Sequence, residues 1–238
     1  MAFSTLLVTL LTVSGVLGQN RWGVTYTPER ICALNGSSVD MRCTYSYPTS
    51  HKVQKAFWFI NWDPWDPKDL SLDPEYSGRV EYPGNLNTDC TFRIKQLRET
   101  DAKTYYFRFL TDSADGKYTG QPGVSLTVTA LQVRVNPGSV TEGQSVTLTC
   151  NTTCTLTGSP VFTWYRNGSP LSFTTQRHQL TASSEDGGTY SCAVKGSELL
   201  PSPAVALTVK AGDWTELVCA VVGSIVTLAL MAVIVWTS

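Results

Sequence analysis

Short stretches in which apolar and polar residues alternate follow one another through the middle of the chain, separated by turns rich in Gly, Pro, Asn and Asp. In residues 145–150, for example, Val146, Leu148 and Cys150 alternate with Ser and Thr, so they share one face of an extended strand. The sequence between the two chain ends contains no amphipathic stretch of useful helical length. This pattern predicts an all-β fold made of packed sheets.

Two apolar stretches at the chain ends depart from the alternation. Leu6–Leu17 ends in small residues and predicts a secretory signal peptide, residues 1–18. Residues 217–236 carry no charge and are long enough for about 30 Å of helix, which predicts a transmembrane helix. The processed signal of a glycolipid anchor is the alternative. Such a signal has a polar spacer of about 8–12 residues, whereas small Gly212 lies only four residues before the apolar run.

The second half of the chain carries a Cys–Trp–Cys pattern. Trp164 follows Cys150 by fourteen residues, and Tyr190 stands two residues before Cys192. An immunoglobulin sandwich has this spacing on its strands B, C and F, where a disulfide joins the sheets against the Trp and the Tyr forms a corner. We therefore predict a Cys150–Cys192 bridge in a constant or intermediate-type domain, residues 130–210, followed by a short stalk, residues 211–216.

The first half repeats the plan with one change. Cys43 stands on a predicted strand B and Tyr105 marks the tyrosine corner, but Phe107 occupies the position of the strand F cysteine. The missing cysteine is Cys90, on predicted strand E. Strands B and E are neighbours in one sheet, and opposed residues there are about 4.5–5.5 Å apart at Cα, so Cys43–Cys90 is predicted as a bridge within one sheet. The long interval before Tyr105 leaves room for strands C′ and C″, which indicates a variable-type domain over residues 19–129.

The two cysteines left over, Cys32 and Cys154, both fall where the chain of each domain turns toward the junction, so we predict that they pair. Free thiols are the alternative, which an oxidising compartment disfavours. Glycosylation motifs of the type Asn-X-Ser/Thr occur at Asn35, Asn151 and Asn167.

Arg108 is the main candidate binding residue. If Phe107 points into the core, strand alternation turns Arg108 outward on the sheet formed by strands G, F and C. A guanidinium offers a planar pair of donors that matches a carboxylate. Tyr118 on the adjacent strand G and Trp22 on strand A are predicted to flank it. The plain alternative is a solvated surface arginine without a role.

Composition and charge exclude several functions. The net charge of −1 provides no basic face for nucleic acid. His51 and His178 have no companion ligands at metal spacing and no nucleophile pattern beside them. We therefore expect a protein that is not an enzyme, has no catalytic residues and binds neither a cofactor nor a metal.

The chain resembles the Siglecs, the sialic-acid-binding immunoglobulin-like lectins, most of all short fish relatives of the B-cell member. The resemblance rests on the stretch from Asp101 to Arg108, on Cys43 and Cys90, and on the additional pair of cysteines. It implies that Arg108 binds the sialic acid carboxylate. It also implies that aromatic side chains contact the N-acetyl and glycerol groups, for which Tyr118 and Trp22 are the candidates, with Lys117 beside them.

The resemblance implies a single-pass type I plasma-membrane receptor, its N-terminus extracellular, that recognises sialylated glycans on glycoproteins or glycolipids. The alternative is an immunoglobulin-type adhesion or decoy receptor whose G-F-C face meets a protein counter-receptor. An immunoglobulin fold hosts both functions, so the fold does not distinguish them.

Overall fold

The computed structural model describes residues 21–62, 65–85 and 88–212 of the 238-residue chain. The predicted signal peptide and the predicted span, residues 217–236, lie outside these residues. The chain divides into two compact units, the first ending at Thr129 and the second beginning at Ala130. In the described part, strands dominate and the only helices are short 3-10 turns, none of which is long and apolar enough to cross a bilayer.

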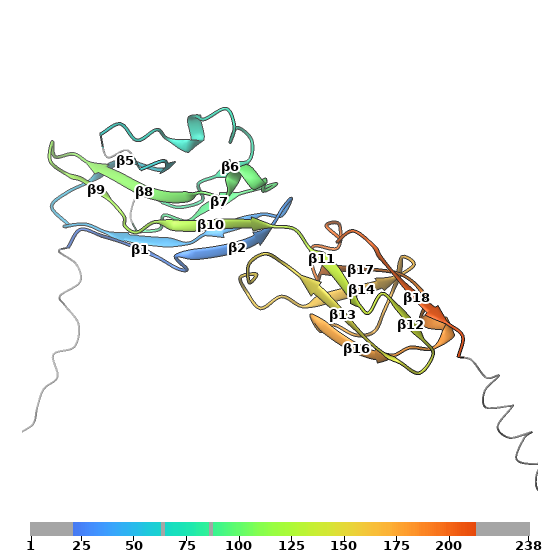
Figure 1. Ribbon diagram of the computed structural model, residues 1–238. Helices are drawn as coiled ribbons and strands as arrows, with labels where there is room; N and C mark the ends of the chain where they lie inside the picture. The colour runs from blue at the N-terminus through green and yellow to red at the C-terminus, as the bar shows by residue number, and fades with distance from the viewer. Residues whose placement is uncertain (1–20, 63–64, 86–87, 213–238) are drawn as a thin grey trace, which may run out of the picture. The chain divides into compact units, whose positions relative to one another are not determined.

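One sheet of the first unit carries the strand of Arg108 at its centre (Figure 1). Strand β5 occupies one edge of β8, so β9 and β10 share the other edge, one after the other along β8. Beyond β10, β2 pairs with it in parallel. The strands of this sheet are β2 (Arg30–Leu34), β10 (Val124–Thr129), β8 (Thr104–Thr111), β5 (Val53–Ile60) and β9 (Lys117–Thr119).

The opposite layer of the first unit is built from two small pieces. One piece pairs β1 (Gly23–Tyr26) with β4 (Cys43–Ser46), and the other is β3 (Val39–Met41), β7 (Phe92–Ile94) and β6 (Val80–Glu81). Cys43 and Cys90 form a disulfide in this layer, with their Cα atoms 5.0 Å apart, and the Cys90 N–H donates to the Cys43 carbonyl. The predicted pairing of Cys43 with Cys90 is confirmed, although Cys90 itself lies two residues before β7 begins.

Strand β8 alternates strictly between buried and half-buried residues. Tyr105, Phe107 and Phe109 are fully buried, while Tyr106 and Arg108 between them are only half-buried. The ring of Phe107 lies 5.0 Å from that of Tyr45, and its other ring contacts include the indole of Trp58. The interior of the unit is therefore filled by aromatic rings where a cystine usually joins the two sheets, as predicted for Phe107.

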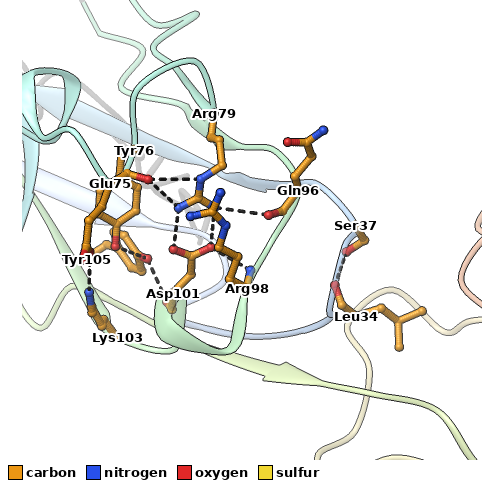
Figure 2. A network of polar contacts seen from close by, with 10 residues as sticks. All are labelled: Leu34, Ser37, Glu75, Tyr76, Arg79, Gln96, Arg98, Asp101, Lys103 and Tyr105. Atoms are coloured by element: carbon orange, nitrogen blue, oxygen red, sulfur yellow. Dashed lines mark hydrogen bonds and ion pairs between the residues drawn. The ribbon is translucent and has the colours of Figure 1, made fainter.

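A buried ion pair fixes the start of β8 (Figure 2). Arg79 donates to both oxygens of Asp101, at 2.7 and 3.0 Å, in the bidentate geometry that suits a guanidinium and a carboxylate. Asp101 lies on the 3-10 turn η2 (Glu99–Asp101), and its carbonyl accepts a 2.8 Å hydrogen bond from the Tyr105 hydroxyl. This is the predicted tyrosine corner. It anchors β8 three residues before Arg108.

The strands C′ and C″ predicted for the first unit are absent from the described residues between β5 and β6. That segment holds the 3-10 turn η1 (Leu70–Leu72), whose buried residue is Leu70. The prediction was wrong because the length of a segment does not measure its strand content. Pro67 and Pro74 cannot donate to a strand ladder, and the segment lacks the alternation of a paired strand.

The second unit is a smaller sandwich with the predicted bridge. One sheet is β11 (Gln132–Asn136), β13 (Ser145–Asn151) and β16 (Arg177–Thr181). The other runs in the order β12 (Ser139–Thr141), β18 (Val205–Lys210), β17 (Gly188–Val194), β14 (Phe162–Arg166) and β15 (Ser169–Pro170). The 3-10 turn η3 (Ser184–Asp186) precedes β17. Cys150 and Cys192 form a disulfide, and buried Trp164 stands opposite Cys192 across β14 and β17. The Tyr190 hydroxyl donates to the Asp186 carbonyl.

Cys32 lies on β2 and Cys154 follows β13. Each takes part in a disulfide. Their predicted pairing with each other stays a prediction.

Candidate functional site

Arg108 projects from the outer face of the β8 sheet, the face turned away from the core. Its neighbours across the sheet are Phe57 on β5 and Thr119 on β9. Residues opposed across an antiparallel pair share one face, so these three side chains lie in a row. Phe57 is buried, and Nη1 of Arg108 lies 3.3 Å from Oγ1 of Thr119, to which it donates. The guanidinium therefore stands half-buried between an aromatic residue and a hydroxyl.

The turn between β8 and β9 sets this register. The Thr111 N–H donates to the Gly116 carbonyl at 2.6 Å, which closes the hairpin and places residue 108 opposite residue 119. Gly116 is buried in the turn, where an added Cβ would lie 3.2 Å from the Ser113 carbonyl oxygen and against the Thr111 hydroxyl. A side chain at position 116 would force the turn apart.

Tyr118 is on the predicted strand but on the other face of the sheet from Arg108. It pairs with Phe109, and the two rings lie 6.0 Å apart on the core side. The prediction that Tyr118 flanks the arginine is wrong, because the hairpin register gives that place to Thr119. Sequence reasoning missed Thr119. Counting outward from a 111–116 closing pair would have found it.

Trp22 directly precedes β1 and packs at the end of the sandwich. Its ring stacks on that of Phe109, with centroids 5.6 Å apart and planes 14° apart, and lies 5.3 Å from the His51 imidazole. The Phe109 ring thus contacts both the Trp22 ring and the Tyr118 ring. The sequence placed Trp22 on strand A. It lies one residue before that strand begins.

A cavity of about 460 Å³ opens at this end of the unit. Three of the four predicted ligand residues, Trp22, Lys117 and Tyr118, line it, and Arg108 is not among its lining residues. Sequence reasoning missed the rest of the wall: His51, Ser113, Asp115 and Gly116. Lys117 pairs with Leu110 and so belongs to the same sheet face as Arg108. Strand β9 therefore runs from Thr119, opposite Arg108, to Lys117 in the cavity wall.

Titratable side chains from two segments of the chain lie at this cavity. Oδ1 of Asp112 lies 3.7 Å from Nδ1 of His51 and accepts a 3.1 Å hydrogen bond from the Lys52 N–H. Asp115 and Lys117 face the same space. The loop before β5 and the turn after β8 are thus held together by Asp112, which fixes the wall that carries His51.

The predicted strand G is divided into β9 and β10, and Tyr26 of β1 supplies a hydrogen-bond partner at the gap between them. The Tyr26 hydroxyl accepts a 3.0 Å hydrogen bond from the Phe107 N–H, a group that a continuous strand would satisfy. Burial raises the pKa of Tyr26 far above its ordinary value, so the phenol stays neutral. Gly120 makes the close approach possible, since an added Cβ would lie 2.7 Å from Cβ of Val24 and against the Tyr26 hydroxyl.

An aromatic pair borders the arginine on the side of β5. Trp62 contacts the ring of Tyr106 edge-on at 4.9 Å, and Tyr106 is the outward residue two positions before Arg108. Over the part of the chain that the structure describes, no three His, Cys, Asp or Glu side chains are grouped to hold a metal ion. The face around Arg108 therefore offers charged hydrogen-bond donors, a hydroxyl group and aromatic surface. These groups can bind a ligand reversibly through hydrogen bonds and ring contacts.

Comparison with protein families fits this architecture. Residues 33–130 match the family model described as B-cell receptor CD22-like, first Ig-like, and residues 130–209 match an immunoglobulin domain model. Both units are immunoglobulin domains. The two matched ranges correspond, in order along the chain, to the two sandwiches described above.

Curated relatives that the chain resembles are longer immunoglobulin proteins. Sialic acid-binding Ig-like lectin 8 of Homo sapiens is 28% identical over 244 residues, covering 88% of this chain and 48% of its own length. Sialic acid-binding Ig-like lectin 9 of Homo sapiens is 30% identical over 169 residues, covering 62% of this chain and 36% of its own length. Protein turtle homolog B of Rattus norvegicus is 26% identical, covering 79% of this chain and 15% of its own. The chain spans less than half the length of these relatives.

Among solved structures, murine CRIg matches with a TM-score of 0.38 and 17% identity over 46% of this chain and 98% of its own. The titin fragment I67–I69 matches with a TM-score of 0.39 and 16% identity, over 82% of this chain and 67% of its own.

Proposed function

We propose that the first immunoglobulin domain binds sialylated glycans and that Arg108 takes the sialic acid carboxylate. The observation that carries the proposal is the half-buried guanidinium on the outer sheet face, held by the Thr119 hydroxyl at 3.3 Å. A carboxylate that replaced water at this guanidinium would gain charge-assisted hydrogen bonds.

The surroundings of Arg108 fit the remainder of such a ligand. Lys117 continues the same sheet face toward the cavity of about 460 Å³, where Trp22 supplies aromatic surface. A sugar has both hydroxyl groups and apolar C–H faces, so it uses polar and aromatic partners together. In this proposal Lys117 and Trp22 contact the ligand, and Tyr118 acts from the core side through its position in the cavity wall.

We further propose that the chain belongs with the sialic-acid-binding immunoglobulin-like lectins, nearest to short fish members. The match of residues 33–130 to the CD22-like model and the likeness to lectins 8 and 9 support this membership. On the same basis we propose a single-pass type I receptor at the plasma membrane, with its N-terminus extracellular. Its role is binding and adhesion, without a catalysed reaction.

The test measures binding of a multivalent sialylated glycan probe to cells that display the full chain. Arg108→Ala should reduce binding at least about 10-fold, because hydrogen bonds to charged groups contribute about 1.5–3 kcal/mol each. Arg42→Ala is the matched control, since Arg42 is an exposed arginine between β3 and β4 in the opposite layer. Sialidase treatment of the probe should abolish binding by the wild type. Equal binding by Arg108→Ala, or by the desialylated probe, would refute the proposal.

A protein ligand is the second candidate, and exposed apolar side chains favour it. In the segment between β5 and β6, Trp65 is 93% exposed and Leu72 is 77% exposed. Apolar surface of this kind marks a protein interaction site where it forms a continuous patch. Binding to target cells that survives sialidase and is lost in Leu72→Asp would establish this alternative.

A further inference from the structure

A second cavity, of about 540 Å³, lies among residues of the second domain. It is bounded by the end of β13 and the residues after it, by the start of β14, and by the stretch that leads into β16. None of the residues that line it carries a charge. The polar part of its wall consists of hydroxyl and amide residues, five threonines together with Asn151 and Gln176.

The remaining wall of this cavity is apolar and partly open to solvent. Val161 is 47% exposed, while Phe162 beside it is buried and Leu156 is half-buried. A wall with neutral hydrogen-bonding groups on one side and apolar surface on the other matches a neutral sugar ring, whose hydroxyl groups and C–H faces need both. The missing charges argue against an anionic or cationic ligand.

Two of the lining residues are the functional positions of a glycosylation motif. In Asn151-Thr152-Thr153, the acceptor asparagine and the hydroxyl residue two positions later both face the cavity. A sugar attached to Nδ2 of Asn151 would therefore begin next to this cavity.

We propose that Asn151 carries an N-linked glycan whose first sugar residues occupy this cavity and cover Val161 and Leu156. The attachment uses a lipid-diphosphate-linked oligosaccharide as donor. Nδ2 of Asn151 forms a bond to C1 of the first sugar, the bond from C1 to the diphosphate oxygen breaks, the diphosphate leaves with the electron pair, and Nδ2 gives up one proton. The proposal is independent of sialic acid recognition by the first domain.

The other two motifs differ from Asn151 in their surroundings. Asn35 is exposed on the first domain and lines neither of the two cavities described. Asn167 lies in the tight turn between β14 and β15, with φ of 50°, and its Oδ1 accepts a 2.8 Å hydrogen bond from the Thr189 N–H. Substitution of Asn167 would disturb this turn, so Asn35 is the better control.

The experiment uses the full chain produced in animal cells, with intact mass and glycopeptide analysis for occupancy. Asn151→Gln and Thr153→Ala should both remove one glycan, while Asn35→Gln leaves the Asn151 glycan in place. Hydrogen exchange of the backbone at Val161, Phe162 and Thr174 should become faster in both Asn151-motif variants. The melting temperature of the second domain should fall by roughly 2–6 °C, the size expected for a modest loss in a domain of this length.

Enzymatic trimming separates the effect of the sugar from that of the substitution. An endoglycosidase that leaves one N-acetylglucosamine should preserve most of the protection around Val161. An amidase that removes the whole glycan by hydrolysing the Cγ–Nδ2 bond, which leaves a carboxylate at position 151, should abolish it, with Asn151→Asp as the control for the added charge. An unmodified Asn151 in the mature protein would overturn the proposal. So would an occupied Asn151 whose complete deglycosylation changes neither hydrogen exchange nor melting temperature.

Discussion

Nη1 of Arg108 and Oγ1 of Thr119 lie 3.3 Å apart across the paired strands β8 and β9. The hydroxyl holds a long side chain near the sheet that would otherwise sample many rotamers in solvent. Ordering such a side chain before a ligand arrives lowers the entropic cost of binding. The threonine is therefore a positioning residue for the arginine.

Removal of this hydroxyl should weaken glycan binding without unfolding the domain. Thr119→Val keeps the branched shape on β9 but cannot accept the hydrogen bond from Arg108. Loss of one such bond corresponds to about 0.5–1.5 kcal/mol, or roughly 2–10-fold in affinity. Titration of a sialylated probe measures the change, and Thr127→Val on the exposed face of β10 is the control. An unchanged affinity in Thr119→Val would contradict the positioning role.

Truncation of Phe107 should destabilise the first domain strongly. Phe107→Ala removes a fully buried ring that contacts Tyr45 and Trp58, and large-to-small changes of this kind cost about 3–5 kcal/mol. Leu110→Ala, on the outer face of the same strand, should cost much less because Leu110 is only half-buried. Denaturant unfolding of the full chain measures both. Equal losses in the two variants would show that the alternation of β8 is not as described.

The sequence predicted the inward and outward faces of β8 because they depend on local alternation alone. Phe107 inward and Arg108 outward follow from the tyrosine corner and a period of two, and the pairing of Cys43 with Cys90 follows from neighbouring strands. The partner of Arg108 could not be predicted in the same way. It depends on which residues close the hairpin, and Thr111 and Gly116 are not marked as a pair by their residue types.

The middle of the first domain was also beyond sequence reasoning. The segment between β5 and β6 is long enough for two strands, but length does not show whether its backbone groups find ladder partners. The described residues there form η1 and irregular chain instead. The cavity residue His51 was missed for a similar reason: its contact with Trp22 joins segments distant in sequence, and no local pattern announces it.

Acid should destabilise the first domain through Asp101. Burial alone would raise the pKa of this carboxyl, but the hydrogen bonds from Arg79 and the Arg98 N–H outweigh burial and hold the pKa below its ordinary value. A depressed folded-state pKa gives stability that is present above the unfolded value, about 4, and is lost as the pH falls through the folded value. The free energy of unfolding should therefore fall on acidification below about pH 4.

Comparison with Asp101→Asn isolates this contribution from that of other carboxylates. The variant leaves Arg79 buried without a charged partner, so it should be about 3–5 kcal/mol less stable near neutral pH. Its stability should also depend less on pH between about 4 and 2 than that of the wild type. Thermal unfolding across this pH range checks both. Parallel curves for the two proteins would exclude Asp101 as the titrating group.

Disulfide mapping should join Cys32 to Cys154 and Cys43 to Cys90. Both members of the first pair take part in disulfides, and the second pair is joined within one layer. Proteolysis of the unreduced full chain, with cleavage between Cys150 and Cys154, should release these two linked peptide pairs and the Cys150–Cys192 pair, all of which mass spectrometry should find separated after reduction. A peptide that links Cys32 to a cysteine other than Cys154 would contradict the predicted pairing.

The short stretch from Tyr105 to Arg108 determines which side chains of β8 face the core and which face outward. Side chains on β8 point alternately to the core and to solvent. Inserting or deleting a single residue in this stretch would therefore turn the guanidinium toward the aromatic core and turn an aromatic side chain outward. Changes of two residues would preserve the arrangement. Arg108 therefore stays on the outer face only when an even number of residues is added to this stretch or removed from it. Loop grafting or strand shuffling in this domain has to respect this constraint.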